Sequence, residues 1–396
     1  MDSPDVIVLG LGATGSAALY QLAKRGARVL GIDRYAPPHI HGSSHGDTRI
    51  TRLAIGEGAH YTPLVRRSHA IWREMERETG AKLMTQTGGL ILSSAAKTSH
   101  THVEDFFDNT IAAAKQHNIA HERLDASEIR RRFPAFAVRD DETGYYEPEA
   151  GYLRPEACVE TNLALACKHG AAIHFHEKAL RFDAAPDHVT VTTEQGVYNA
   201  CKLVLAAGPW LPELLAPAHA APFRIYRQVL VWFDVEGSIA PFEPQRFPVF
   251  IWELQGLDQG LYGFPAIDGP RGGVKVATEQ YVATTTPDAA ARDISAQEIA
   301  AMHATYIAPH FPRLSPRAVK VATCLYTVTP DAGFVVDTHP DSQRVIVASP
   351  CSGHGFKHSA ALGEVLADLV ETGQARADIS AFRLSRLQSP AAGHTA

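Results

Sequence analysis

The first part of the chain places a helix-favouring segment between two short apolar runs. Val6–Leu9 and Val29–Ile32 are apolar runs with the length and composition of buried parallel strands. The segment between them, Ala17–Lys24, is rich in helix-favouring residues, and Gly26 is typical of a helix end. The pattern therefore predicts a strand–helix–strand unit at the start of a parallel sheet.

Three glycines lie in the turn that joins the first strand to the helix. Gly10, Gly12 and Gly15 match Gly-x-Gly-x-x-Gly, in which the glycines permit a tight turn, backbone approach to a pyrophosphate and helix–strand packing. Asp33 ends the second strand, where an acidic side chain accepts hydrogen bonds from ribose hydroxyls. These residues predict a site for an adenine dinucleotide, and leave open whether it is FAD or NAD.

The later pattern predicts further helices and two kinds of strand. Helices are expected over 64–80, 104–117, 155–170 and 359–371, with a short capped helix over 124–134. Strands are expected at 88–92, 171–175, 189–192, 203–205 and 344–348. The short apolar segments 226–233, 249–252, 260–264 and 273–277 are separated by turns, which is typical of an antiparallel sheet. The chain is therefore predicted to be α/β, with a Rossmann-type domain and a second, antiparallel-sheet domain.

Composition narrows the class of protein. The 396 residues are 45% hydrophobic and 20% charged, as in ordinary globular enzymes, and the net charge of −6 argues against a nucleic-acid partner. No apolar run approaches the ~20 residues of a membrane helix, and no signal-type segment precedes the first strand, so we expect a cytoplasmic protein without a membrane partner. The five cysteines are scattered and the 20 histidines form no ligand pattern, so we predict no metal.

Two groups of basic residues have more than one interpretation. Arg49 and Arg52 lie in a polar loop rich in Pro, Gly and His, and they would share a face if 48–54 were helical. An anion-binding loop and a solvated basic loop both remain open. Lys275 is surrounded by apolar residues, so it either has a functional charge in the core or extends to the surface. The glycine-rich turn before Lys357 lies between a strand and a helix, a setting typical of an anion or polar-ring site.

Three longer motifs resemble one known family. They are Gly42-Ser-Ser-His-Gly-Asp-Thr-Arg-Ile50, Cys324-x-Tyr-x-x-Thr-Pro-Asp331 and Ser352-Gly-His-Gly-Phe-Lys357, and together they resemble the monomeric sarcosine oxidase family, which includes N-methyltryptophan oxidase. The resemblance implies a monomer with the two-domain fold of D-amino-acid oxidases. Its FAD domain would comprise 1–84, 146–222 and 321–396, and its substrate domain 85–145 and 223–320. The turn-rich segment 144–153 would cross between the two domains.

The resemblance also implies roles for individual residues. FAD would be attached through the sulfur of Cys324, and Lys275, Arg49 and His45 would act beside the flavin. The substrate would contact Arg52, Lys357, Tyr262 and Glu279, where Glu279 replaces a histidine of sarcosine oxidase. The cofactor residues would be Gly10, Gly12, Ala13, Thr14, Gly15, Asp33, Arg34, Ser43, Ser44, His45, Thr48, Arg49, Cys324, Gly353, Gly355, Phe356 and Lys357.

The activity that the resemblance implies is oxidation of a secondary amino acid. An N-methyl or cyclic amino acid would be oxidised at its C–N bond to an imine, and O₂ would be reduced to H₂O₂. The main alternative is an FAD-dependent amino-acid dehydrogenase that passes electrons to another acceptor. A catalytically silent flavoprotein and an NAD enzyme are weaker alternatives, because the cationic residues and the C-terminal flavin motifs are both present.

Overall fold

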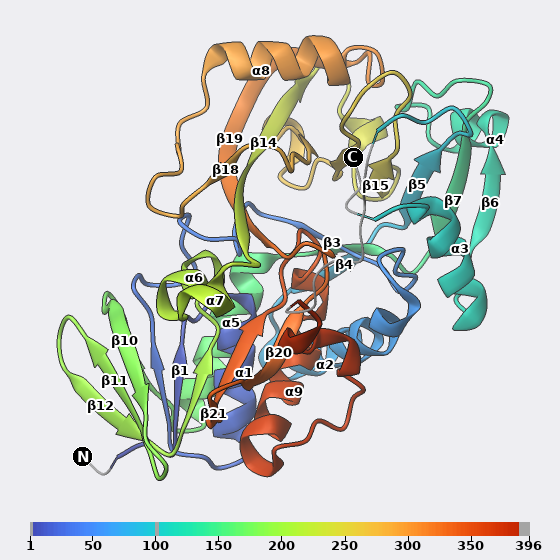
Figure 1. The fold of residues 1–396 in the computed structure, drawn as a ribbon. Coiled ribbons are helices and arrows are strands. Elements are labelled where there is room, and N and C mark those ends of the chain that lie inside the picture. The colour runs from blue at the N-terminus through green and yellow to red at the C-terminus, as the bar shows by residue number, and fades with distance from the viewer. Residues whose placement is uncertain (1–2, 100–102, 388–396) are drawn as a thin grey trace.

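Two large β-sheets organise the chain. The computed structural model describes residues 3–99 and 103–387. Figure 1 shows a mostly parallel sheet in the lower half of the view and a mostly antiparallel sheet in the upper and right-hand parts. Within the described ranges, no helix combines the length and the apolar character that crossing a lipid bilayer would require.

The lower sheet is centred on β1 (Val6–Leu9), whose four residues are all buried. β1 pairs in parallel with β2 (Val29–Ile32) and with β13 (Lys202–Leu205). The remaining strands are β9 (Ala172–His174) and β21 (Ser342–Ser349), both parallel, and β20 (Val335–His339), an antiparallel edge. Their order is β20-β21-β13-β1-β2-β9. The buried apolar runs of β1, β2, β13 and β21 are typical of such strands and were predicted, as was β9 at the edge, whereas β20 was not.

Helices cover this sheet, and two small sheets flank it. The helix α1 (Ala13–Lys24) follows the glycine turn and packs against two later helices, as Figure 1 shows. The helices are α2 (Thr62–Thr79), α5 (Pro155–Lys168), α6 (Leu211–Leu214), α7 (Pro217–Ala220) and α9 (Ser359–Thr372). One small sheet contains β10 (Ala179–Ala184), β11 (Val189–Thr193) and β12 (Val197–Ala200), and the other β3 (Arg49–Thr51), β8 (Gly151–Leu153) and β4 (Met84–Gln86).

The upper sheet has nine strands in the order β18-β14-β17-β16-β15-β5-β7-β6, with β19 paired to β14. Its pairs are antiparallel except β5 with β15. The strands are β5 (Gly89–Ser93), β6 (Glu122–Asp125), β7 (Thr143–Glu147), β14 (Arg224–Val235), β15 (Val249–Trp252), β16 (Leu261–Gly263), β17 (Val274–Thr278), β18 (Thr284–Thr285) and β19 (Leu314–Val328). The helices beside it are α3 (Phe106–Gln116), α4 (Ala126–Arg132) and α8 (Ala296–Met302). An aromatic cluster fills its core, with the Phe136 and Phe247 rings stacked 4.7 Å apart.

Three local features differ from or extend the sequence predictions. The segment 48–54 is not helical, because Arg49–Thr51 forms β3 and pairs with β8. The long strand β19 was missed, because its apolar residues before Ala322 are interrupted by Ser315, Pro316, Arg317 and Lys320 and form no continuous apolar run. The capped helix was correct: Asp125 accepts a hydrogen bond from the Glu128 N–H and completes a capping box.

Candidate active site

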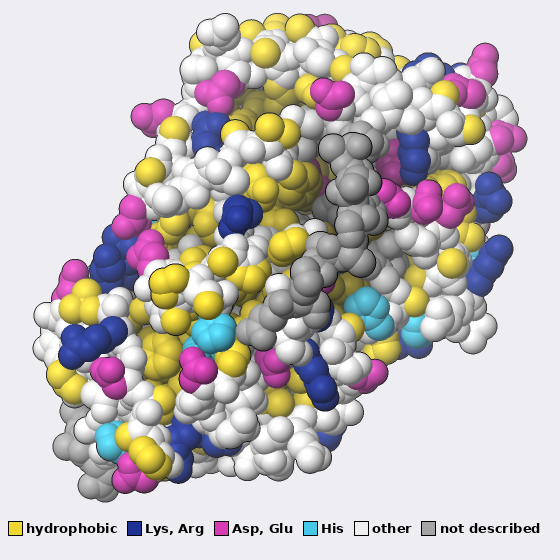
Figure 2. Space-filling view, in the orientation of Figure 1, with side chains coloured by type: hydrophobic (Ala, Val, Ile, Leu, Met, Phe, Trp, Pro, Cys, Tyr) yellow, Lys and Arg dark blue, Asp and Glu magenta, His cyan; other side chains and the backbone are white. Residues whose placement is uncertain are grey.

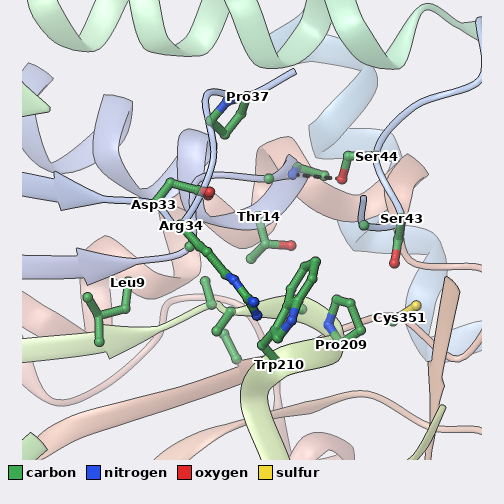
Figure 3. Close-up of a pocket in the computed structure, with 18 of the residues that line it drawn as sticks. Leu9, Thr14, Asp33, Arg34, Pro37, Ser43, Ser44, Pro209, Trp210 and Cys351 are labelled. Carbon is green, nitrogen blue, oxygen red and sulfur yellow. Dashed lines mark hydrogen bonds between the residues drawn. The ribbon is translucent and has the colours of Figure 1, made fainter. Parts of the chain in front are cut away.

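A large cavity opens at the carboxyl ends of β1 and β2. Its volume is about 1400 Å³, and this value includes the open space at its mouth. Its walls include most of the residues that the sequence assigned to the cofactor: Gly10, Gly12, Ala13, Thr14, Asp33, Arg34, Ser43, Ser44, Arg49, Gly353, Gly355 and Phe356. Figure 3 shows several of these side chains around the space, and we call it the first cavity. In open α/β sheets, ligands bind beyond the carboxyl ends of the strands, so this position suits a nucleotide.

The glycine turn keeps the floor of the first cavity free of side chains. Gly10 has φ +84°, and a Cβ there would lie 2.5 Å from the carbonyl oxygen of Ala206. A Cβ on Gly15 would lie 1.8 Å from the carbonyl oxygen of Gly10. Only glycine is compatible with both positions, so the turn stays tight and its backbone is accessible from the cavity.

Side chains from separate segments hold this turn in place. The Asp33 carboxylate accepts hydrogen bonds from the Leu11 N–H (2.6 Å) and the Tyr35 N–H (2.8 Å). The Ala13 N–H donates to Ser44 Oγ at 3.0 Å, the bond drawn dashed in Figure 3. The acidic side chain is therefore positioned at the cavity wall, where ribose hydroxyls can also donate to it.

Sequence reasoning missed the aromatic wall of the first cavity. Trp210 lies in a short helical turn after β13, and in Figure 3 its ring is beside Arg34. The Arg34 guanidinium is 5.6 Å from the Trp210 ring centroid and forms an ion pair with Asp288. The glycine turn, the acidic strand end and this flat apolar wall fit the adenosine part of an adenine dinucleotide.

A second cavity of about 780 Å³, also counted with its open space, adjoins the first. Arg49, Tyr326, Gly353 and Phe356 line both cavities, so the two spaces meet at these four residues. The remaining walls of the second cavity combine apolar side chains with charged and polar ones: Ile50, Arg52, Glu57, Phe106, Ile251, Gly260, Leu261, Tyr262, Phe264, Glu279, His354 and Lys357. Apolar walls with a few polar groups are typical of small-molecule sites. On the face seen in Figure 2, hydrophobic side chains gather in a hollow between the two halves of the molecule.

Two buried cations share one carboxylate in the second cavity. Arg52 Nη2 donates to Glu57 Oε2 at 2.7 Å, and Lys357 Nζ lies 3.6 Å from Glu57 Oε1. Arg52 also donates to the carbonyl of Ala54, and its guanidinium lies 4.9 Å from the Phe106 ring centroid. Burial lowers the pKa of Lys357 to about 8. Both cations that the sequence assigned to the substrate are thus brought together, and Glu57, which no sequence pattern had indicated, holds them.

Tyrosine side chains surround Glu279, which lines another part of the second cavity. Tyr281 donates to Glu279 Oε2 at 2.9 Å, and Tyr326 donates to Oε1 at 3.2 Å. The hydroxyls of Tyr262 and Tyr326 are 3.3 Å apart. Burial raises the pKa of Tyr281 and of Tyr326 well above the usual range, so both hydroxyls remain donors.

Lys275 lies behind the second cavity and not in its wall. It is only 2% exposed, and its Nζ donates to the carbonyls of Gly46 (2.7 Å) and Thr48 (3.0 Å) and to Thr48 Oγ1 (3.3 Å). Burial, followed by the charge of Arg49, lowers the pKa of Lys275 well below its usual range. The lysine is therefore buried in the core, which excludes the surface interpretation.

Cys324 lies on β19, buried next to the junction of the two cavities. Its Sγ is 3.5 Å from Arg49 Nη2 and 3.7 Å from the carbonyl oxygen of Ser43. Arg49 also donates to the carbonyls of Thr48 (2.8 Å) and Ser43 (2.6 Å), so it ties the loop to the strand. Cys324 itself lines neither cavity, whereas Cys351 lines the first.

Several residues assigned from the sequence support the walls without lining them. Gly15, His45, Thr48, Lys275 and Cys324 line neither cavity. His45 is buried with its Nε2 unpartnered, and burial lowers its pKa to about 3, so the ring is neutral. Arg49 and Arg52 would have shared a face only if 48–54 were helical. Arg49–Thr51 is a strand instead, and Arg49 lines both cavities whereas Arg52 lines only the second.

One group of metal-type ligands lies away from both cavities. Among the described residues, His219, His339 and Asp341 place their ligand atoms within 4.8 Å of one another. These three residues form no metal-binding motif in the sequence, because His219 lies far from the other two. They line neither cavity.

Comparison with known proteins places this geometry in a family. A family model described as FAD dependent oxidoreductase matches residues 5–369, so the chain belongs to this family. It is 41% identical to a monomeric sarcosine oxidase of Streptomyces avermitilis, with 97% of both chains covered. It is 35% identical to an N-methyl-L-tryptophan oxidase of Yersinia pestis, with 97% of this chain and 99% of the relative covered. These similarities confirm the predicted resemblance to the sarcosine oxidase family.

A solved structure supports the same conclusion for the fold. The open form of NikD, described as an unusual amino acid oxidase essential for nikkomycin biosynthesis, matches with a TM-score of 0.84. The two chains are 25% identical over 97% of this chain and 98% of the other. The predicted α/β fold, with a Rossmann-type part and a second sheet, is therefore confirmed.

Proposed function

We propose that the protein oxidises secondary amino acids, N-methylated or cyclic, at the C–N bond to an imine and reduces O₂ to H₂O₂. The observation that carries this proposal is the pair Arg52 and Lys357 in a cavity that adjoins the glycine-turn cavity. A guanidinium and an ammonium next to each other form a receptor for a carboxylate. The names of the relatives, sarcosine oxidase and N-methyl-L-tryptophan oxidase, support the same substrate class.

The carboxylate of the substrate would bind between Arg52 and Lys357. In the structure Glu57 contacts both cations and keeps them in one place, which supports a role in positioning them. The apolar side chains of Phe106, Ile251 and Phe264 would cover the rest of the ligand and exclude water. This arrangement fixes the amino acid by its carboxylate and directs its amine towards the junction of the cavities.

FAD is the cofactor that the family and the first cavity indicate. When bound, it supplies the two-electron acceptor for the C–H bond next to nitrogen and passes the electrons to oxygen. We propose that Gly10, Gly12 and Asp33 hold its adenosine diphosphate part. The remaining assigned cofactor residues would surround the rest of the molecule, with Gly353, Gly355 and Phe356 beside the junction.

We further propose that Cys324 carries FAD covalently. Its position beside Arg49, which lines both cavities, supports this assignment. In wild-type protein the yellow colour should remain with the acid-precipitated chain, and in Cys324→Ser it should appear in the supernatant. Cys351→Ser is the matched control, because this thiol lines the first cavity but lies outside the Cys-x-Tyr motif. If Cys351→Ser released the colour and Cys324→Ser retained it, the attachment would be assigned to Cys351.

Lys275 would supply the positive charge that stabilises superoxide as oxygen is reduced. Its three oxygen acceptors favour the charged ammonium, whereas burial opposes it. This ammonium already donates to protein oxygens and lines neither cavity, which would limit its contact with O₂. The second candidate function is therefore a dehydrogenase that passes electrons to another acceptor. Release of peroxide decides between the two.

A screen of N-methyl amino acids, pipecolate, proline and glycine for peroxide release tests the proposed function. We expect peroxide with at least one secondary amino acid. Flavin bleaching without peroxide would indicate the dehydrogenase, and no bleaching with any of these compounds would contradict both. We also propose that the protein is a cytoplasmic monomer and that its FAD and substrate domains have the boundaries given above; light scattering at several concentrations tests the monomer.

A further inference from the structure

The second cavity has two charged regions of opposite sign. Arg52 and Lys357 contribute cations, and Glu57 is in contact with both of them. Glu279 adds a second carboxylate to the same cavity wall. Its negative charge raises the pKa of Lys357 against the larger effect of burial, so the two regions are close enough to influence each other. A ligand that complements both regions carries a negative and a positive group.

The Glu279 carboxylate is held in a fixed orientation. Tyr281 donates to one oxygen and Tyr326 to the other. A hydroxyl orders a carboxylate and stabilises its charge without cancelling it. An ionised carboxylate accepts at about four lone-pair sites, so these two hydroxyls do not use all of its acceptor capacity. Tyr326 also lines both cavities, so this carboxylate is anchored at the junction where the C–N bond would react.

We infer that Glu279 binds the amine of the substrate as an ammonium, so that the cavity selects zwitterionic amino acids by both of their charged groups. This inference rests on the proposed function, because it places the carboxylate at Arg52 and Lys357. Tyr281 lines neither cavity and acts as a positioning residue through Glu279. The carboxylate also stabilises the ammonium against loss of its proton, and oxidation of the C–N bond requires the neutral amine. Glu279 therefore sets the pH at which the bound substrate becomes reactive.

The test compares two ligands of nearly equal shape that lack any C–H bond next to nitrogen. In 2-aminoisobutyrate an ammonium occupies the place of one methyl group of 2,2-dimethylpropanoate. Their dissociation constants are measured on the holoenzyme from changes in the flavin spectrum. Wild-type protein should bind the amino acid more tightly. In Glu279→Gln the ratio of the two constants should shrink by roughly tenfold or more, the usual effect of losing a charged hydrogen bond.

Two variants separate this role from a general loss of structure. Tyr281→Phe keeps the carboxylate and removes one of its donors, so the ratio should shrink by a few-fold only. Glu253→Gln is the matched control, because Glu253 is a buried carboxylate paired with Lys97 outside both cavities, and its ratio should stay at the wild-type value. If Glu279→Gln does not fold, Glu279→Asp and Tyr281→Phe give the same comparison.

A second readout is the pH profile of flavin reduction by a secondary amino acid without oxygen. The rate should rise with pH as the bound ammonium loses its proton, and the midpoint should move to lower pH in Glu279→Gln. An unchanged ratio of dissociation constants together with an unchanged midpoint would overturn the inference. Failure of both ligands to bind wild-type protein would instead count against the proposed function.

Discussion

The two cavities are lined by different kinds of residue. In the first, the glycine turn and the acidic strand end lie close together in the sequence, and Trp210, Gly353 and Phe356 complete the walls from later segments. The second combines apolar walls with charged and tyrosine side chains, from loops and strands that are far apart in the sequence. The glycines of the first cavity carry no charge, and the buried Asp33 carboxylate beside them accepts hydrogen bonds from two backbone N–H groups. The second cavity buries several charges, which is unfavourable unless they are paired, and this is typical of a site kept for function.

The largest expected effect concerns Lys275, which lies behind the second cavity. Lys275→Met removes the positive charge behind the second cavity, and the reaction of reduced protein with oxygen should slow by about a hundredfold, as for loss of one transition-state donor. Stopped-flow measurement should show that reduction by substrate changes far less. Lys320→Met is the control, because Lys320 also lies over the Trp232 ring, at 4.9 Å, but is half exposed and pairs with Asp47. Equal slowing of both half-reactions would remove Lys275 from the oxygen step.

The next effect belongs to the charged part of the second cavity. Arg52→Ala removes one charged contact, so the dissociation constant of 2,2-dimethylpropanoate should rise by about ten- to a hundredfold. Flavin content should stay at the wild-type level, since Arg52 does not line the first cavity. Arg132→Ala is a suitable control, because Arg132 pairs with Glu122 and lies over Tyr146 outside both cavities. An unchanged constant in Arg52→Ala would exclude it from the carboxylate site.

A change in the first cavity should instead lower the flavin content. Gly10→Ala places a Cβ 2.5 Å from the Ala206 carbonyl oxygen, so the turn must shift, and flavin per protein should fall by about tenfold. Gly26→Ala is the control: Gly26 also has a positive φ of +88°, but nothing lies within 4 Å of its Cβ. Absorbance of the purified variants gives the flavin content. Full flavin in Gly10→Ala would show that the turn does not shape the cofactor site.

The smallest effect is a pH dependence in the second cavity. Burial lowers the pKa of Lys357 to about 8, so its positive charge is present below this pH and is lost above it. The affinity for 2,2-dimethylpropanoate should therefore fall as pH rises past 8, by up to about tenfold per unit. In Lys357→Met binding should be weaker at pH 7 and independent of pH between 7 and 9. A pH dependence that survives in this variant would assign the titration to another group.

The same contrast explains what could be predicted from the sequence. β1, the glycine turn and α1 follow from local rules, because strand, turn and helix succeed one another within 20 residues. The strand β19 could not be predicted in this way, because its exposed half lacks an apolar run. Arg52 and Lys357 were assigned only through family resemblance, since no spacing rule brings residues 305 positions apart together. Glu57, Tyr281 and Trp210 gave no local signal, because their partners are fixed by tertiary packing.

The central claim is that the two cavities form one site, in which an amino acid held by Arg52 and Lys357 reduces a flavin bound at the glycine turn. Mixing the holoenzyme with N-methyl amino acids or pipecolate in the absence of oxygen tests it most directly. We predict that at least one of them bleaches the flavin absorbance, that air restores it with release of peroxide, and that Arg52→Ala requires a much higher concentration. No bleaching by any secondary amino acid, or bleaching of Arg52→Ala at the wild-type concentration, would contradict the claim.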